Sequence, residues 1–250
     1  GHILAPDSGN IVAPPAERYN MADKPSDPSM GLLAEDINKL LDPGYLPIEV
    51  GFCQLPNGCA MLANKTFMPG VTPEMFDFWF AWHGVEAMRY KIWNPHQHYS
   101  VETLNMDKAM DKSLSLKERY WDTTHHVYED CGMGPQHIYI NFRNPADIGF
   151  DPEKLKAFKG TIVCSGNEKS HSIMCHFLRP VEGGCELRSR FWFGYHVVDG
   201  KPALHPMVAH GGPFPIFPVI ALLGHNIKEF TNLADKLPAI YNEFIGEFTK

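Results

Sequence analysis

Long hydrophobic runs and positive charge are the two features that this sequence most clearly lacks. No stretch approaches the roughly 18 consecutive apolar residues that suggest a membrane-spanning helix. The 22 lysines and arginines stand against 29 aspartates and glutamates, and no basic patch of the kind that a phosphate backbone requires is visible. We therefore expect neither a membrane nor a nucleic acid as partner. Residues 1–3 (GHI) show no positive region followed by an apolar one, so we expect no signal peptide.

Motifs of cysteine and serine chemistry are also missing. The six cysteines form no CxxC pair and no zinc-ribbon spacing. Cys164 and Cys175 lie in hydrophobic runs typical of strands, so we expect buried, reduced thiols, which favour a cytoplasmic protein. No GxSxG pattern marks a nucleophilic serine.

The chain is long enough for one substantial hydrophobic core preceded by an arm. Residues 1–45 are rich in proline, aspartate, serine and asparagine, with one short helical stretch at 32–41, and we expect them to pack on the main body or on a partner subunit. Residues 46–250 are predicted to form the main domain. Because the arm lacks a core of its own, a homodimer through it is compatible with the sequence, although no residue pattern proves it.

The first elements of this domain have clear local signals. Residues 48–53 and 59–63 flank an Asn-Gly dipeptide, which predicts a β-hairpin. Thr72 is a good N-cap and Pro73 suits the first helical position, so a helix is predicted over 75–88, with a break near Gly84.

The later elements define the fold class. Apolar and polar residues alternate at 89–93, which predicts a strand, and the final region 216–248 is helical in period, with a kink or restart at Pro238. This order indicates an α+β helix-grip (Bet v 1-like) fold, in which an antiparallel sheet wraps around a long C-terminal helix and leaves a cavity. Further strands are predicted at 136–142, 160–165, 172–178 and 185–198.

One pair in the final helix carries ligand chemistry. His225 and Glu229 are four residues apart, so their side chains lie on one helix face about 6 Å apart. Such a pair can bind a metal or form a plain hydrogen-bonded couple. One such pair is weak evidence for a metal site, and its apolar surroundings strengthen that evidence. Upstream, His98 and Glu129 are candidates to face the same cavity. Two histidines and two carboxylates suit zinc and, less selectively, iron or manganese.

Other residues have two interpretations each. His176 interrupts a hydrophobic strand, where a lone histidine is usually a hydrogen-bonded core residue; facing a cavity with a metal, it becomes a candidate proton-transfer group. Four aromatic residues are most simply core or wall residues and would contact a substrate only if the cavity exists. They are Tyr90, Trp93, Phe191 and Phe193.

A competing metal motif involves His96. The spacing of His96, His98 and Glu102 matches the metal-binding triple of cupins. The flanking glycines of that motif are missing, and residues 200–205 do not rebuild its second half. This interpretation is therefore the weaker one.

Five segments of the sequence carry a family pattern. The segments are 89–98 (RYKIWNPHQH), 127–129 (VYE), 175–180 (CHFLRP), 186–192 (ELRSRFW) and 224–229 (GHNIKE). Together they resemble the diacetylphloroglucinol hydrolase family, which includes phloretin hydrolase. The resemblance spans roughly residues 47–235, and its most specific parts are the ELRSRFW run and the HxxxE helix.

The resemblance implies roles for individual residues. His98, Glu129, His225 and Glu229 would bind Zn²⁺, and His176 would be the catalytic histidine beside the ring of the substrate. The group that takes the proton from water is left open, and a loosely held Glu129 or Glu229 could do so. Tyr90 matches a family tyrosine that contacts the substrate.

Two positions depart from the family pattern. Val101 stands where the diacetylphloroglucinol enzymes carry an asparagine, and Phe191 replaces a second substrate-contacting tyrosine. Both departures remove hydrogen-bonding groups near the expected acyl site. They favour a substrate with an apolar acyl tail, such as phloretin.

The resemblance implies a zinc-dependent hydrolase that cleaves the carbon–carbon bond between an acyl group and a phloroglucinol-type ring. With phloretin the products would be phloroglucinol and a carboxylic acid, and the partner would be a small acylated polyphenol. One alternative is a mono- or diacetylphloroglucinol hydrolase. The other is a non-enzymatic helix-grip protein that binds a hydrophobic or phenolic ligand in the same cavity.

Overall fold

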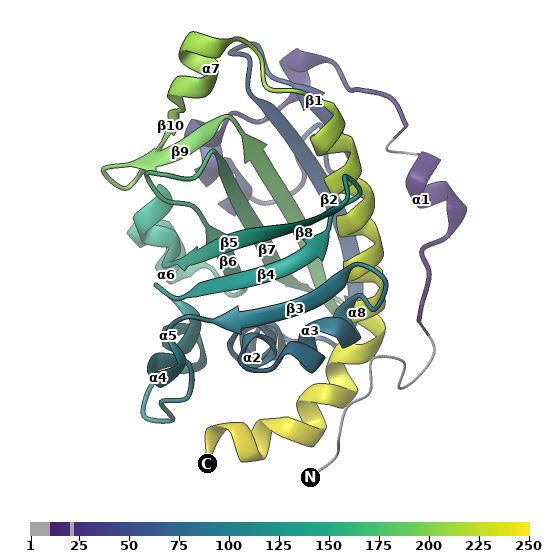
Figure 1. Ribbon diagram of the computed structural model, residues 1–250, viewed down its shortest axis with the longest axis vertical. Helices are drawn as coiled ribbons and strands as arrows, with labels where there is room; N and C mark the ends of the chain where they lie inside the picture. Colours follow the sequence, from purple (N-terminus) through teal and green to yellow (C-terminus); the bar gives the residue numbers. More distant parts are fainter. Residues whose placement is uncertain (1–10, 21–22) are drawn as a thin grey trace.

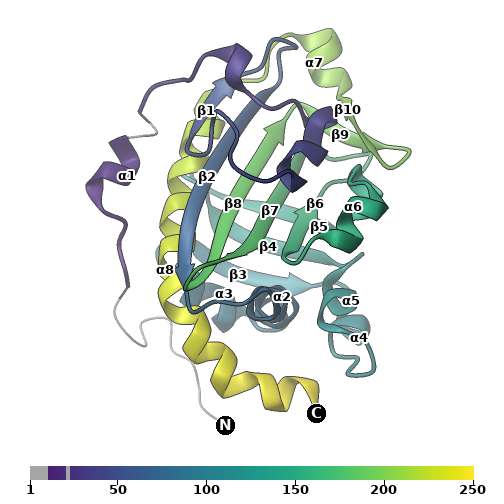
Figure 2. The same ribbon diagram turned by 180° about the vertical axis from the view of Figure 1, so that it is seen from behind.

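An antiparallel sheet and one long helix, α8 (Phe217–Thr249), dominate the structure, a computed structural model that describes residues 11–20 and 23–250. The eight strands follow the order β1-β2-β8-β7-β6-β5-β4-β3, and every pair in the sheet is antiparallel. The sheet bends so strongly that β3–β5 cross in front of β7 and β8, with α8 running along one side (Figures 1 and 2). The predicted helix-grip fold is confirmed.

The strands of the sheet are β1 (Gly51–Gln54), β2 (Ala60–Pro69), β3 (His98–Thr103), β4 (Thr124–Asp130), β5 (Pro135–Arg143), β6 (Thr161–Ser165), β7 (Ser172–Val181) and β8 (Gly184–Phe193). A separate hairpin consists of β9 (Tyr195–Val198) and β10 (Lys201–Leu204). The helices before α8 are α1 (Ala16–Asn20), α2 (Pro73–Trp82), α3 (Ala87–Trp93), α4 (Met106–Ala109), α5 (Leu116–Tyr120), α6 (Pro152–Ala157) and α7 (Pro206–Gly211). The 3-10 turns are η1 (Pro28–Met30), η2 (Ala34–Leu41), η3 (His83–Val85) and η4 (Pro145–Ile148).

The first hairpin forms as its turn residues predict. Gly58 has a φ of 89°, which a residue with a side chain rarely adopts, and the Asn57 side chain accepts a hydrogen bond from the backbone N–H of Cys59 at 2.9 Å. Strands β1 and β2 then pair in register.

The helical region that follows begins as predicted but extends further. The Thr72 hydroxyl accepts a hydrogen bond from the backbone N–H of Met75 at 3.2 Å, and α2 ends at Trp82, just before Gly84. The predicted strand at 89–93 is wrong, because these residues belong to α3. Tyr90 and Trp93 are both buried at helical spacing, and a five-residue run cannot separate a period of 2 from one of 3.6.

The predicted strand at 185–198 is two strands. Gly194 stands between β8 and β9 with a φ of 88°, and a Cβ at this position would lie 2.5 Å from a methyl carbon of Val208. Only glycine therefore fits where the chain leaves the sheet for the β9–β10 hairpin.

Helix α8 continues through Pro238, so of the predicted kink or restart the structure has the kink. Its last turns bend away from the axis of the first part (Figures 1 and 2), as expected near an internal proline. The helix packs against β1, β2, α2 and α3. Val219, Leu223 and Ile227 enter one core, and Phe230 and Leu233 enter a second core with the aromatic side chains of α2.

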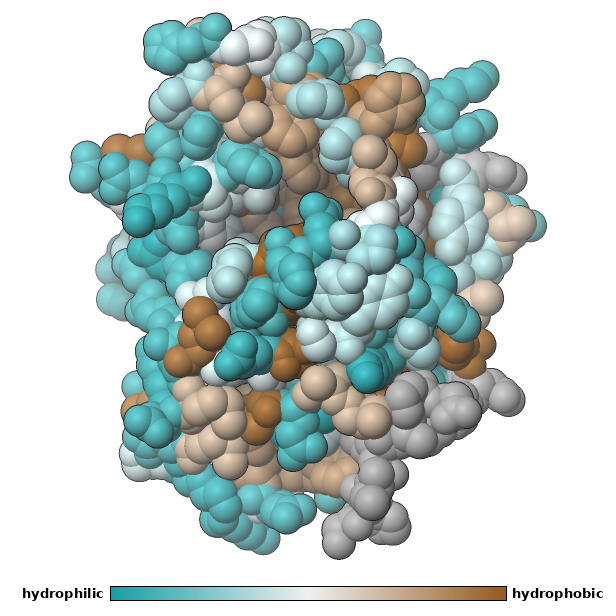
Figure 3. Space-filling model, in the orientation of Figure 1, coloured by the Kyte–Doolittle hydropathy of each residue, from teal (hydrophilic) through white to brown (hydrophobic). Residues whose placement is uncertain are grey.

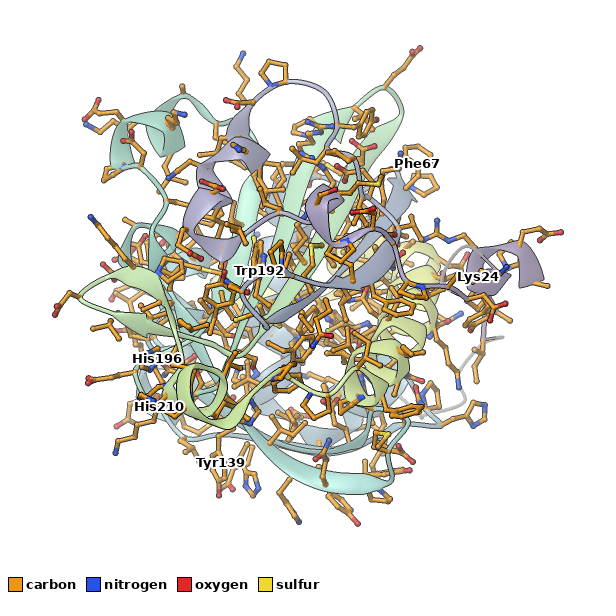
Figure 4. All side chains as sticks on the ribbon, turned by 90° about the horizontal axis from the view of Figure 1, so that it is seen from above. Lys24, Phe67, Tyr139, Trp192, His196 and His210 are labelled. Carbon is orange, nitrogen blue, oxygen red and sulfur yellow. The ribbon has the colours of Figure 1, made fainter. Side chains whose placement is uncertain are left out.

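The segment before the domain contributes to the first core. Leu32, Ile37 and Leu40 are buried there, and the backbone carbonyl of Leu32 accepts a hydrogen bond from the Trp192 indole at 2.8 Å. Figure 4 shows Trp192 in the interior of the molecule. The division between an arm at 1–45 and a domain at 46–250 stays a prediction, and residues 1–10 lie outside the described part of the chain.

Apolar residues also gather at the surface, where they line a hollow in the upper half of the face seen in Figure 3. Among the described residues, no helix combines the length and apolar character needed to cross a membrane. All six cysteines are free and buried, which confirms their predicted burial.

Candidate metal centre and active site

Four buried side chains converge between the sheet and α8. The Nε2 atoms of His98 and His225 lie 3.3 Å apart, and Oε2 of Glu229 lies 3.1 Å from the first and 3.0 Å from the second. Oε2 of Glu129 lies 3.4 Å from Nε2 of His98 and 3.8 Å from Nε2 of His225. The structure thus brings together the four residues that the resemblance implies as metal ligands.

The elements that carry these residues explain their meeting. His98 begins β3, and Glu129 is its register partner on β4, next to an irregularity in the pairing between His98 and Ser100. His225 and Glu229 lie on successive turns of α8, which crosses this end of the sheet. A strand pair and one helix turn therefore supply two ligand-type residues each.

Hydrogen bonds on the far side of each imidazole fix its tautomer. Nδ1 of His98 lies 3.0 Å from the backbone carbonyl of Tyr90, and Nδ1 of His225 lies 2.9 Å from Oε1 of Gln97. Since both partners are acceptors, each Nδ1 carries the proton when the ring is neutral. Each Nε2 then presents a lone pair toward the two carboxylates, as in metal-binding histidines.

The donor set fits a metal ion. Donors bound tetrahedrally to zinc at about 2.0–2.1 Å lie about 3.3 Å apart, close to the measured separations. Two imidazole nitrogens with two carboxylate oxygens suit a borderline cation. His98, His225 and Glu229 form the tightest group, and Glu129 joins it through the two histidines.

His225 and Glu229, the two site residues on α8, also shift each other's pKa through electrostatic attraction. Burial lowers the pKa of His225, but the charge of Glu229 outweighs this effect and raises the pKa to about 9. Burial raises the pKa of Glu229, whereas His225 and His98 lower it to about 2. Glu229 is therefore an anion at neutral pH, ready to bind a cation.

Tyr90 holds the carboxylate of Glu129, the fourth residue of the cluster. Its hydroxyl donates to Oε2 of Glu129, and its ring stacks on His98 with centroids 3.8 Å apart and planes 4° apart. Burial and the neighbouring Glu129 raise the pKa of Tyr90 well above 10, so the phenol stays protonated and remains a donor. The thiol of Cys131 contacts the other oxygen of Glu129 at 3.3 Å.

A cavity adjoins these carboxylates. His176 lines it from β7 and is held by a 2.8 Å hydrogen bond between its Nδ1 and the buried hydroxyl of Ser189. Because a hydroxyl can both donate and accept, the imidazole can take either tautomer. Burial lowers the pKa of His176 to about 4, so the ring is neutral at ordinary pH. Apolar walls come from Phe80, Ile140, Phe142, Met174 and Leu222.

Three of the five predicted substrate contacts line this cavity, namely Tyr90, Trp93 and Phe191. Val101 and Phe193 do not. Val101 is buried on β3 opposite Val127, which lines the cavity in its place. Phe193 stacks behind Phe191 at 6.2 Å and packs against Phe214 at 5.3 Å.

The cupin interpretation finds no support in the geometry. His96 is exposed, and the side chain of Glu102 is 73% exposed, 3.9 Å from the outward-facing His126. Only His98 of that triple reaches the interior.

Sequence reasoning missed His83, His125 and Gln97. His83 and His125 line the cavity, and Gln97 orients His225. The adjacent histidines at 125 and 126 were a usable signal, because one of two neighbours in a strand must face inward. The position of His83 depends on the break between α2 and α3, which sequence spacing does not fix.

Gly84 makes room for one of these histidines, and we expect a substitution there to be costly. A Cβ at Gly84 would lie 2.3 Å from Cε1 of His125 and 2.8 Å from the Thr103 hydroxyl. Gly84→Ala should therefore lower the free energy of unfolding by about 1–3 kcal/mol through overpacking. In α8, a Cβ at Gly246 would meet no described atom within 4 Å outside the backbone of its own helix, so Gly246→Ala is the matched control and should be neutral or slightly stabilising. Urea titration of both variants measures the difference, and equal midpoints would contradict the packing argument.

Comparison with known proteins gives a consistent result. Residues 32–242 match the family model described as the DAPG hydrolase PhiG domain. A phloretin hydrolase from Eubacterium ramulus is 38% identical over 78% of this chain and 72% of its own length. A 2,4-diacetylphloroglucinol hydrolase from Pseudomonas protegens is 32% identical over 84% of this chain and 73% of its own length.

Among solved structures, the chain is similar to Ara h 8.0201, with a TM-score of 0.36 and 12% identity over 70% of this chain and 98% of that one. It is also similar to norcoclaurine synthase from Thalictrum flavum in complex with dopamine and hydroxybenzaldehyde, with a TM-score of 0.37 and 10% identity over 69% of this chain and 85% of that one.

Proposed function

This chain belongs to the DAPG hydrolase family, and we propose that it is a zinc-dependent hydrolase that cleaves the carbon–carbon bond between an acyl group and a phloroglucinol-type ring. The observation that carries the proposal is the convergence of His98, Glu129, His225 and Glu229 at a cavity that also contains His176. A metal-binding donor set and a neutral imidazole thus share one enclosed space.

The favoured substrate is phloretin or a close analogue. The relative named phloretin hydrolase is 38% identical to this chain, against 32% for the two diacetylphloroglucinol hydrolases. Phe191, Met174 and Leu222 give the cavity an apolar side that suits an aryl-alkyl tail better than a short, polar acyl group.

The chemistry starts from the ring, because an aryl carbanion is too poor a leaving group for direct hydrolysis. A 1,3,5-trihydroxylated ring can tautomerise so that the acyl-bearing carbon gains a proton and becomes part of a β-diketone. Water then adds to the acyl carbon, the bond between that carbon and the ring breaks, and the electron pair moves onto the ring oxygen as an enolate. Reprotonation yields phloroglucinol and the carboxylic acid.

His98, Glu129, His225 and Glu229 would hold a zinc ion, which would polarise a carbonyl oxygen and lower the pKa of water at the site. Four protein ligands are more than a catalytic zinc usually has, so one of the two carboxylates would have to be free for proton transfer. Glu129 is the carboxylate suited to this role, since its oxygen is the farther of the two from both histidines. We therefore assign to Glu129 the role of accepting the proton of the attacking water. The hydroxyl of Tyr90 holds the Glu129 side chain in position.

His176 is assigned the transfer of the proton at the acyl-bearing ring carbon of the substrate. Its Nδ1 is engaged by Ser189, and the cavity-lining ring leaves Nε2 for the substrate. The hydroxyl of Ser189 accommodates both tautomers, so Nε2 can accept a proton from a ring hydroxyl or donate one to the acyl-bearing carbon. The aromatic rings of Phe80 and Phe230, 5.8 and 4.8 Å away, keep this imidazole in place.

A substrate comparison tests the proposal. Zinc-loaded protein is assayed with phloretin, monoacetylphloroglucinol and diacetylphloroglucinol, and we expect the highest kcat/KM with phloretin. A higher value for either acetyl compound would overturn the substrate assignment but keep the reaction. No turnover of any of the three, with about one zinc per chain, would favour the alternative of a helix-grip binding protein.

Orientation of His225 by Gln97 gives a prediction about the metal. Gln97→Leu removes the acceptor that holds Nδ1 at 2.9 Å and should weaken zinc binding about 10- to 100-fold. The neighbouring His96→Ala, an exposed position, is the control and should leave affinity unchanged. A competition titration with a chromophoric chelator measures both, and an unaltered affinity in Gln97→Leu would contradict the assigned role.

Two further assignments accompany the function. The six free, buried thiols support a cytoplasmic location, where disulfides are rare. A homodimer through the N-terminal segment stays a prediction of the sequence.

A further inference from the structure

Two buried histidines of the cavity have no part in the reaction described above. His83 lies in η3, directly after α2, and His125 lies on β4. Both line the cavity, and both are almost fully buried, at 2% and 3% exposure. Their rings meet edge to face with centroids 5.3 Å apart.

The hydrogen bond of His83 to the backbone leaves Nε2 of its ring as a hydrogen-bond acceptor. Its Nδ1 lies 2.7 Å from the backbone carbonyl of Trp79, which can only accept. Nδ1 therefore carries the proton of the neutral ring, and Nε2 presents a lone pair. The ring is clamped between Trp79 and Tyr90, with centroids at 5.2 and 5.8 Å and planes 19° apart in each case.

The backbone of His125 pairs within the sheet, but its imidazole makes no hydrogen bond with the other described residues. The ring packs against Phe142 at 4.7 Å, and Cε1 and Nε2 face Gly84. A polar group at a cavity wall that lacks a protein partner can complete its hydrogen bonding with a ligand or water. Burial lowers the pKa of both histidines, so neither gains a charge that would compensate.

A hydroxyl group of the substrate ring can supply the hydrogen bonds that these two histidines do not make within the protein. We propose that His83 and His125 bind a ring hydroxyl of the substrate, in a subsite separate from the metal ligands and from His176; this inference rests on the proposed function. The ring of Phe80 contacts both His83 and His176, with centroids 5.3 and 5.8 Å away, and the ring of Tyr90 contacts both His83 and His98, at 5.8 and 3.8 Å. A trihydroxylated ring in this cavity therefore meets polar groups on three sides: the metal cluster, His176 and the histidine pair.

The subsite is specific for hydroxyl groups for a physical reason. Nε2 of His83 accepts the hydroxyl proton, and a neutral imidazole such as His125 can either donate to or accept from the same oxygen. A ring that lacks this hydroxyl leaves both groups buried and unpaired, so the site discriminates against it.

The test uses ring fragments and needs no turnover. Calorimetric titration of the zinc-loaded protein compares phloroglucinol with resorcinol, which has one hydroxyl fewer. We expect phloroglucinol to bind about 3- to 10-fold more tightly, as one net hydrogen bond implies. His83→Asn keeps a donor for the Trp79 carbonyl but removes Nε2, and His125→Leu removes both ring nitrogens; each should bring the two affinities closer, and the double variant should make them equal.

Matched variants keep the result interpretable. His126→Leu changes the next residue of β4, whose ring stacks on the exposed Tyr139 at 4.4 Å, and should keep the preference. If His125→Leu does not fold, His125→Gln replaces it. Retention of the full preference in the double variant, or no preference in the unaltered protein, would overturn the subsite. The protein could also fail to cleave phloretin and still prefer phloroglucinol to resorcinol in a way that depends on the two histidines. That result would overturn the proposed reaction but support the subsite.

Discussion

Replacement of His225 by alanine is expected to remove zinc from the protein and to lower kcat/KM for phloretin by at least about 10³-fold. A metal acting as a Lewis acid contributes several kcal/mol to transition-state stabilisation, and each 1.36 kcal/mol corresponds to a factor of ten. His225 supplies the nitrogen that lies closest to Oε2 of Glu229, at 3.0 Å, and its loss leaves that buried carboxylate with one imidazole fewer. Metal content by atomic emission and steady-state kinetics measure the two effects.

The control for this variant is a histidine outside the cavity. His210 is exposed on α7, and Figure 4 shows it at the periphery of the molecule. His210→Ala should keep both zinc and turnover. A His225→Ala protein that retains about one zinc per chain and full activity would show that the metal, if required, binds elsewhere.

The second large effect is expected at His176. His176→Asn preserves a polar group near Ser189 but removes Nε2, and kcat should fall about 10²- to 10⁴-fold, as for loss of a general acid or base. Zinc content should stay unchanged, because the hydrogen bond of His176 goes to Ser189 and its ring contacts are with Phe80, Phe191 and Phe230, none of which is a proposed ligand. A variant with normal kcat, or one that loses zinc in parallel, would contradict a role in proton transfer.

Acid conditions provide an independent readout for His176. Burial lowers its pKa from 6.5 to about 4, so the unfolded chain binds more protons than the folded one between these values. Its contribution to stability is therefore present above pH 6.5 and is lost as the pH falls toward 4. Thermal unfolding of metal-free protein at several pH values should show a shallower acid decline for His176→Asn than for the unaltered protein; identical declines would contradict the burial argument.

The sequence predicts elements whose signals are local. The Asn57-Gly58 turn and the Thr72 cap each depend on a few neighbouring residues, and both appear in the structure where they were expected. The run at 89–93 was misassigned because five residues cannot define a period. Strands β3 and β4 carry polar residues on their outer faces and gave no clear hydrophobic alternation.

In the candidate site, too, some residues could be predicted from local sequence and others depend on the tertiary structure. The spacing of His225 and Glu229 is readable from the sequence, because four residues make one helix turn. His98 and Glu129 meet that pair only through the register of two strands and the crossing of α8, which no local pattern fixes. His83 and His125 depend on the break after α2 and on the close approach of Gly84, so their place in the cavity emerges only from the packing.

Metal-dependent cleavage is tested by a chromatographic analysis of phloretin incubated with zinc-loaded protein and with chelator-treated protein. Phloroglucinol and 3-(4-hydroxyphenyl)propionate should appear in equal amounts with the zinc-loaded protein only. Intact phloretin in both samples, with zinc bound at His98, Glu129, His225 and Glu229, would contradict it.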